Sequence, residues 1–190
     1  MSWEANRKVL WNVRPARPAD SARIAEIYNE GIEDGEAKLE AVPRTAEQVL
    51  ALMCTPGYHL FAAEWGNTIL GWAAISPYGR GEAYAATIGE ASVFISHSGR
   101  FQGIGRILME ALLRAAEERG YHKLVGQIFS SNEPSRRLCR SLGFREVGVH
   151  EKQGRLGHRW IDIVLVERLI PASVEKLSGQ GRIIVTSAQA

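Results

Sequence analysis

The sequence predicts a single domain of the mixed α/β, or α+β, class. Helix-like and strand-like segments alternate along the 190 residues, and pairs of strand-like segments stand near both ends of the chain. A chain of this length can bury a sizeable core, and its 45% hydrophobic and 23% charged residues are typical of a globular protein. We expect the domain to span residues 1–170. Residues 171–190, which begin with Pro171 and are rich in Ser, Gly and Gln, are expected to form a C-terminal extension.

The composition argues against several kinds of partner. The 23 basic and 21 acidic side chains leave a net charge of +2, which gives no field that would attract nucleic acid or an anionic membrane. The five histidines show no His-x-x-x-His pairing, so we expect no metal site. Cys54 and Cys139 lie far apart, which argues against a disulfide framework. No apolar run reaches the ~20 residues of a membrane-spanning helix. Because the chain also starts without the apolar segment of a signal peptide, we expect a cytoplasmic protein.

The first half of the chain is predicted to form strands and two helices. Pro18 suits the first turn of a helix in which Ile24 and Tyr28 share one face. Thr45 and Gln48 have the spacing of a capping box, which starts a second helix. In chain order, the predicted segments are a strand over 9–14, helices over 18–30 and 45–53, hairpin strands over 59–64 and 68–76, a loop over 77–81 and a strand over 87–96.

The second half contains the clearest helix. Ile104, Leu108 and Leu112 recur at helical spacing, charged residues occupy the other side, and Gly120 follows as a C-terminal cap. Another glycine, Gly143, ends a shorter helix. In chain order, the predicted segments are a helix over 104–119, a strand over 123–129, a helix over 134–142, and hairpin strands over 145–151 and 159–168.

The most informative stretch is Arg100-Phe-Gln-Gly-Ile-Gly105, which lies between a strand-like run and the clearest helix. Two glycines spaced Gly-x-Gly let the backbone turn tightly and point several N–H groups at one anion. The N-terminus of the following helix adds partial positive charge at the same place. A Walker loop would need Gly-Lys-Ser/Thr and a dinucleotide fingerprint would need a third glycine, and both are missing. The stretch therefore predicts a site for a phosphate-bearing ligand.

In this setting the motif resembles the acetyl-CoA loop of the GCN5-related N-acetyltransferases (GNAT). The order along the chain is similar to that family: a strand, the Arg-x-x-Gly-x-Gly loop, a helix, a strand, Asn132, and a helix that ends in Leu-Gly-Phe. This resemblance implies the GNAT fold, a central mixed and mostly antiparallel sheet flanked by helices, with a splayed strand that binds acetyl-CoA. Five further segments are similar to the branch that acetylates phosphinothricin, arsinothricin and methionine sulfoximine: 27–29, 39–45, 132–135, 138–148 and 154–162.

The resemblance implies acetyl-CoA as co-substrate. Backbone N–H groups of the loop would hold its pyrophosphate, with Arg100 or Arg106 adding charge. Its pantetheine arm would add to the edge of the preceding strand, as a peptide augments a sheet. Asn132 resembles the family's pantetheine-contacting asparagine, but it also suits an ordinary helix cap, and both roles can coexist. The expected cofactor-binding residues are Val93, Phe94, Ile95, Arg100, Phe101, Gln102, Gly103, Ile104, Gly105, Arg106, Asn132 and Ser135.

Acetyl transfer requires a neutral amine, and an α-amino group titrates near ~8, so a base must remove its proton. The resemblance implies Glu90 as this base, whereas a glutamate at a strand end is otherwise commonly just solvated. The stretch before it, 85–89, is one residue longer than in related chains. Where the family places a Tyr or His acid, this chain has Cys139. Its thiol could protonate the leaving thiolate, or it could be a small buried apolar residue.

For the acceptor amine the resemblance carries fewer residues. Related enzymes use an aromatic residue near Leu39 and an arginine near Ala85, and both are absent here. A charged amino-acid analogue would still need cations for its acidic groups and aromatic side chains as walls. The candidate substrate-binding residues are Tyr28, Arg44, Tyr78, Arg80, Tyr84, Arg155 and Arg159.

Taken with the resemblance, these residues predict an acetyl-CoA-dependent N-acetyltransferase that acts directly on the primary amine of a small amino-acid-like toxin or analogue. Direct transfer fits a sequence without a credible Cys–His nucleophile pair. One alternative keeps the fold but changes the acceptor to a protein N-terminus or a polyamine. Another is a non-catalytic acetyl-CoA-binding sensor. The resemblance also implies a homodimer.

Overall fold

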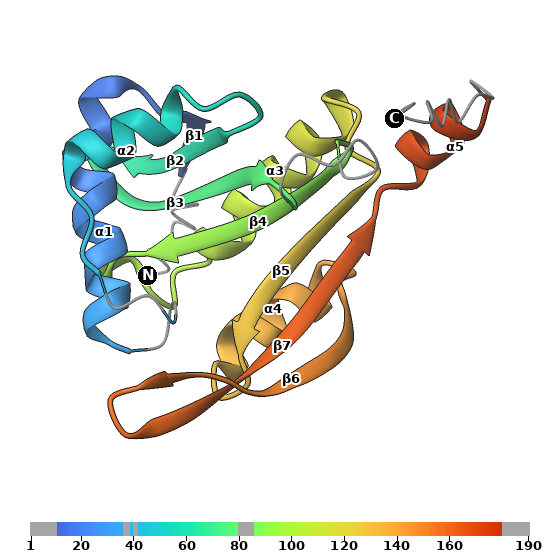
Figure 1. Ribbon diagram of the computed structural model, residues 1–190. Helices are drawn as coiled ribbons and strands as arrows, with labels where there is room; N and C mark the ends of the chain where they lie inside the picture. The colour runs from blue at the N-terminus through green and yellow to red at the C-terminus, as the bar shows by residue number, and fades with distance from the viewer. Residues whose placement is uncertain (1–10, 36–38, 40–41, 80–85, 180–190) are drawn as a thin grey trace, which may run out of the picture.

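The computed structural model describes residues 11–35, 39, 42–79 and 86–179. Within them a seven-stranded sheet has the order β1-β2-β3-β4-β5-β7-β6 (Figure 1). All neighbouring strands are antiparallel except β4 and β5, so the sheet is mixed and mostly antiparallel, as predicted. The strands are β1 (Asn12–Pro15), β2 (His59–Trp65), β3 (Thr68–Pro77), β4 (Ile88–Ile95), β5 (Lys123–Phe129), β6 (Arg145–Leu156) and β7 (Arg159–Leu169).

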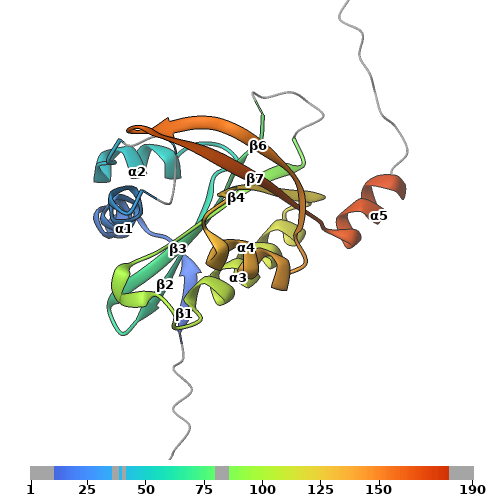
Figure 2. The same cartoon turned by 90° about the horizontal axis from the view of Figure 1, so that it is seen from below.

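Helices cover both faces of the sheet (Figure 2). On one face, α1 (Ser21–Glu33) and α2 (Ala46–Met53) bury Ile24, Tyr28 and Val49 against β3 and β4. On the other face lie α3 (Ile104–Glu118) and α4 (Glu133–Ser141). The remaining helical segments are the 3-10 turns η1 (Pro18–Asp20) and η3 (His97–Gly99), and α5 (Pro171–Gly179).

Strand alternation divides the hydrophobic core between these two faces. In β3, Trp72 and Ala74 belong to the core under α1 and α2, whereas Ala73 and Ile75 belong to the core under α3 and α4. In β4, Phe94 lies on the α1 face, while its neighbours Val93 and Ile95 contact the α3 face. Every second residue of β4 therefore lies on the same face of the sheet.

The two parallel strands β4 and β5 diverge. Their pairing covers three registered positions and ends at Glu90 opposite Val125, although both strands continue. Beyond this point β4 pairs only with β3, and β5 pairs with β7, so the two strands open into a wedge (Figure 1). Residues 91–95 thus have one backbone edge without a strand partner in the described part of the chain. This confirms the splayed strand that the sequence resemblance implied.

Several local predictions are confirmed by the backbone. Thr45 Oγ1 accepts from the N–H of Gln48 at 3.3 Å, and Gln48 Oε1 accepts from the N–H of Thr45 at 3.0 Å, which completes the capping box of α2. After α3 the chain turns at Gly120 with φ +78°, as the cap predicts. The predicted strand 123–129 has the bounds of β5.

Other boundaries differ from the prediction. Helix α1 extends to Glu33 rather than to about residue 30. Strand β6 runs to Leu156 rather than residue 151, because shifts of register between Glu146 and Gly148 and between His150 and Gly154 let it continue beside β7. The proposed extension 171–190 begins with a helix, α5. Residues 1–10 and 180–190 lie outside the described residues.

Candidate active site

The predicted anion-binding loop lies between β4 and α3. Its backbone adopts positive φ at Phe101 (61°) and at Gly103 (81°), and Gly103 directly precedes α3. The backbone N–H groups of residues 101–105 donate to no acceptor among the described residues. Unpaired N–H groups at the start of a fifteen-residue helix are suited to an anion such as a pyrophosphate.

The second glycine of the loop has a packing role. A Cβ at Gly105 would lie 3.1 Å from Leu138 Cδ2, so glycine permits the close approach of α3 and α4. Arg106 reinforces the same contact, because its Nη2 donates to Ser141 Oγ at 2.8 Å while its Nη1 lies 3.3 Å from Glu110. Its charge is therefore shared with an acidic neighbour.

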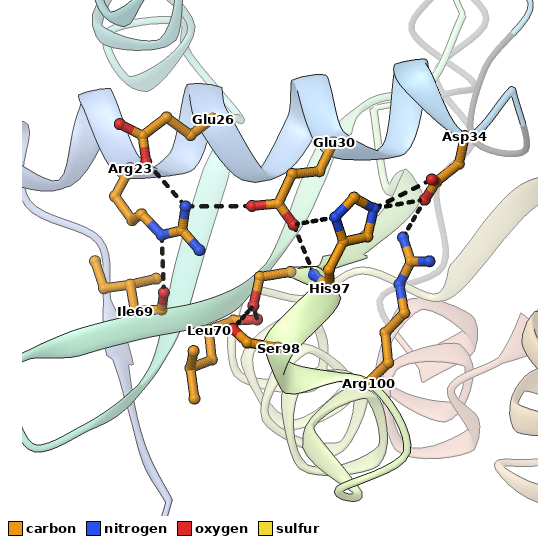
Figure 3. Close-up of polar contacts among 10 residues, drawn as sticks. Arg23, Glu26, Glu30, Asp34, Ile69, Leu70, His97, Ser98 and Arg100 are labelled. Carbon is orange, nitrogen blue, oxygen red and sulfur yellow. Dashed lines mark hydrogen bonds and ion pairs between the residues drawn. The ribbon is translucent and has the colours of Figure 1, made fainter.

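Arg100, the other predicted cation of the loop, points toward α1. Its guanidinium forms an ion pair with Asp34, the C-terminal cap of α1, and this hydrogen bond holds the pKa of the Asp34 carboxyl below its ordinary value (Figure 3). His97 Nε2 lies 3.1 Å from the same carboxylate, and the N–H of His97 donates to Glu30 Oε2 at 2.6 Å. The contacts of Arg100 and His97 thus tie the loop to the C-terminal half of α1.

The edge of β4 is available along the stretch predicted to bind the pantetheine arm. Val93, Phe94 and Ile95 pair with β3 through Ala73, Trp72 and Gly71 on one side, and no described strand pairs with the other side. Such an edge presents alternating N–H and C=O groups that an amide-bearing chain can join.

Asn132 lies at the N-terminus of α4, directly after β5. Its Oδ1 accepts from the N–H of Ser135 at 3.1 Å, so the capping role is confirmed. Both residues lie at the start of the helix that borders the loop through Leu138 and Gly105. Their contact with pantetheine stays a prediction.

Glu90 occupies the point where β4 and β5 separate. It pairs with Val125 in β5 and with Ser76 in β3, and its side chain is partly buried. Because strand residues alternate, its side chain shares the face of Ser92 and Phe94, which is the α1 face. The carboxylate therefore lies on the same face as the cavity described below.

That cavity has a volume of about 210 Å³ and lies between α1, α2, β3 and β4. A more open groove of about 370 Å³ adjoins it and shares Tyr28, Arg44, Leu52 and Thr55. Two of the predicted substrate residues, Tyr28 and Arg44, line both spaces. The lining of the inner cavity comprises Tyr28, Arg44, Leu52, Thr55, Tyr58, Trp72, Ala74, Ser76, Pro77, Ser92 and Phe94.

Sequence reasoning missed most of this lining. The signal for its floor was present, since Trp72, Ala74 and Ser76 alternate along one predicted strand. Tyr58 precedes that hairpin, and burial raises the pKa of its hydroxyl. The contribution of each residue depends on α1 and α2 lying over the sheet, which no local pattern indicates.

The other predicted substrate residues lie elsewhere. Tyr78 is 40% exposed and lines neither space. Arg155 and Arg159 are exposed on the β6–β7 hairpin, where the Arg155 guanidinium lies 5.5 Å from the ring centre of Trp160. Arg80 and Tyr84 fall outside the described residues.

The proposed general acid, Cys139, is buried. Its side chain is 7% exposed in the core beneath α3 and α4, and burial raises the pKa of the thiol to about 11. A thiol in this environment is a poor proton donor at neutral pH, which favours the interpretation of Cys139 as a core residue.

The described residues include neither a metal site nor a membrane-spanning helix. No three His, Cys, Asp or Glu side chains among them gather closely enough to hold a metal ion. None of the helices they form combines the length and apolar character needed to cross a membrane.

Comparison with known proteins agrees with the fold and the loop. Residues 23–144 match the family described as Acetyltransferase (GNAT) family. A phosphinothricin N-acetyltransferase from Alcaligenes faecalis is 32% identical over 164 residues, which cover 84% of this chain and 83% of that protein. An L-methionine sulfoximine/L-methionine sulfone acetyltransferase from Pseudomonas aeruginosa is 30% identical over 160 residues, 82% of this chain and 92% of that protein.

A solved structure is similar over the same extent. The phosphinothricin acetyltransferase from Sinorhizobium meliloti, in complex with AcCoA, superposes with a TM-score of 0.80 at 27% identity, covering 84% of this chain and 88% of that one. Three observations therefore agree. Residues 23–144 match the family, the N–H groups of the loop before α3 have no partner among the described residues, and β4 diverges from β5. This chain belongs to the acetyltransferase (GNAT) family.

Proposed function

We propose that this protein transfers an acetyl group from acetyl-CoA directly to the primary amine of a small amino-acid-like acceptor of the phosphinothricin, arsinothricin or methionine sulfoximine type. The observation that carries the proposal is the unpaired edge of β4, which connects the anion loop at one end with Glu90 at the other. The acceptor cavity opens on the face of β4 that carries Glu90. Relatives named for such acceptors support this choice.

The residues fit acetyl-CoA in two places. The five unpaired N–H groups of residues 101–105 suit its pyrophosphate, and the free edge at residues 93–95 suits the amides of its pantetheine arm. When bound, acetyl-CoA supplies an acetyl group activated as a thioester. An arm laid along β4 from the loop would bring this thioester toward Glu90, where β4 and β5 separate.

Glu90 then accepts the proton of the acceptor's ammonium group, directly or through one water. The neutral nitrogen forms a bond to the thioester carbonyl carbon, the C–S bond breaks, and its electron pair leaves on the sulfur of coenzyme A. The nitrogen then loses a second proton to solvent, which leaves a neutral amide. An α-ammonium group titrates near ~8 in model peptides, so most of the acceptor arrives protonated at neutral pH and the proton transfer depends on the positioning of the carboxylate. The buried Cys139 is not needed, because solvent can protonate the leaving thiolate.

The test is release of free coenzyme A thiol from acetyl-CoA, with wild type beside Glu90→Gln. We expect turnover on at least one amino-acid analogue and a loss of roughly 10²- to 10⁴-fold in kcat for the variant. Glu118→Gln, a change at an exposed glutamate on α3, is the matched control and should leave kcat unchanged.

The acceptor panel separates the alternatives. Polyamines and peptides with free N-termini stand beside phosphinothricin, arsinothricin and methionine sulfoximine, and turnover on the former alone would replace our choice of acceptor. Binding of acetyl-CoA without turnover on any amine would indicate a sensor. If Glu90→Gln turned over at the wild-type rate, Glu90 would not be the base, but the proposed acetyl transfer would stand.

A further inference from the structure

We propose that the inner cavity binds a single carboxylate of the acceptor through Arg44 and the indole N–H of Trp72, and that the rest of the acceptor's side chain is uncharged. This inference rests on the proposed function and makes it more specific. It selects acceptors of the methionine sulfone type, whose side chain is neutral, over phosphinothricin, whose side chain carries a second negative charge.

The position of Arg44 is fixed by α1. Asn29 Oδ1 accepts from the N–H of Arg44 at 2.8 Å, and Asn29 Nδ2 donates to the carbonyl oxygen of Arg44 at 3.0 Å. The guanidinium carbon lies 4.3 Å from the ring centre of Tyr28, which forms part of the same cavity wall. No carboxylate among the described residues pairs with Arg44. A stacked guanidinium without an acidic partner retains the donors that a carboxylate requires.

Trp72 provides an independent observation. It is 3% exposed and lines the cavity, and its Nε1–H has no hydrogen-bond acceptor in the described structure. Its ring is fixed by stacking, 4.5 Å from Phe94 at an interplanar angle of 17° and 6.5 Å from Tyr28. A buried donor without a partner is destabilising, and an anion admitted by a small movement of the wall would satisfy it.

The remaining lining explains the preference for one charge. Arg44 is the only charged residue of the described lining, and the other members are aromatic, aliphatic or hydroxyl-bearing. A second anion would lose its hydration without gaining a cation from these described residues, which is costly, whereas Thr55, Ser76 and Ser92 can bond a neutral polar group. A volume of about 210 Å³ is below the roughly 300–1,000 Å³ of pockets for drug-sized ligands, so it suits an acceptor of amino-acid size.

The direct test follows the indole N–H signals by two-dimensional NMR with coenzyme A present, so that no turnover occurs. The chain has five tryptophans, and Trp72→Phe identifies the Trp72 signal while Trp65→Phe serves as the matched control at an exposed site. L-methionine sulfone should shift the Trp72 signal, and the carboxamide of the same compound should not. The proposal would be overturned if the carboxamide shifted the Trp72 signal equally, or if the signal did not shift while the acid bound.

Kinetics give the second readout. We expect wild type to favour the acid over its carboxamide, and Arg44→Gln to lower kcat/KM for the acid by roughly 10- to 100-fold while leaving the carboxamide nearly unchanged. Arg114→Gln, an exposed site on α3, should preserve the preference. Phosphinothricin should be the poorer acceptor, and a preference for it would contradict the single-anion assignment.

The two proposals fail in distinguishable ways. A Trp72 shift without any release of coenzyme A from acetyl-CoA would support the carboxylate site and refute acetyl transfer to that amine. Turnover with an unchanged acid-to-carboxamide ratio in Arg44→Gln would support acetyl transfer and refute the site. Absence of both the shift and the turnover would refute both.

Discussion

Among single residues, Cys139 combines a reactive group with an unreactive environment. Its thiol lies in the core beneath α3 and α4, and burial raises its pKa to about 11. Removal of a general acid would lower kcat by roughly 100-fold or more, and we do not expect Cys139→Ala to show such a loss. The variant should lose about 1 kcal/mol of unfolding free energy through weaker packing. A large loss of kcat at unchanged stability would restore the acid role.

The same residue predicts a pH dependence of stability. The folded pKa is raised, so the unfolded chain releases the thiol proton first as the pH rises. The contribution of Cys139 to stability is therefore complete below the ordinary thiol pKa of 9.0 and is lost as the pH approaches about 11. In urea titrations, the difference between wild type and Cys139→Ala should shrink across this interval. A constant difference would contradict the assignment.

At the scale of elements, the loop before α3 can be tested with two matched glycines. Gly103 and Gly120 stand at opposite ends of α3, with φ of +81° and +78°, and a Cβ added at either site would meet no atom within 4 Å. An alanine at either site adopts a disfavoured left-handed conformation, which costs about 1–2 kcal/mol. We expect similar losses of stability from Gly103→Ala and Gly120→Ala.

Binding of acetyl-CoA should separate these two variants. Only Gly103 orients the unpaired N–H groups of the loop, so its change should weaken the Kd for acetyl-CoA by about tenfold, which corresponds to about 1.4 kcal/mol. Calorimetric titration measures the Kd of each variant. Equal weakening by Gly120→Ala would assign the effect to general destabilisation rather than to the loop.

The elements that were predicted well from sequence are those with local signals. The capping box at Thr45 and the glycine after α3 involve neighbours a few residues apart, and both are confirmed. Strand β6 was predicted too short because its bulges interrupt the alternation of side chains that marks a strand. Its long pairing is set by β7, which follows it in the chain.

At the scale of the whole molecule, the candidate site combines predictable and unpredictable parts. The loop and the splayed strand followed from a contiguous motif and the family it resembles. The cavity required Arg44, Trp72 and Tyr58 to meet through the packing of α1 and α2 on the sheet, and the partner of Arg100 is Asp34, 66 residues away. Sequence spacing contains no information on such contacts until the fold places them.

The homodimer stays a prediction, and the sheet suggests where to test it. The last strand, β7, is paired on both sides, so among the described strands the unpaired edge at this end of the sheet is β6. Val147 and Val149 on β6 are 50% and 52% exposed, and Trp160 on β7 is 54% exposed. Exposed apolar groups beside a free strand edge favour association.

We expect light scattering to give twice the mass of one chain, and Val147→Glu with Val149→Glu to give a folded monomer. A monomeric wild type would refute the dimer, whereas a dimeric double variant would place its interface away from β6.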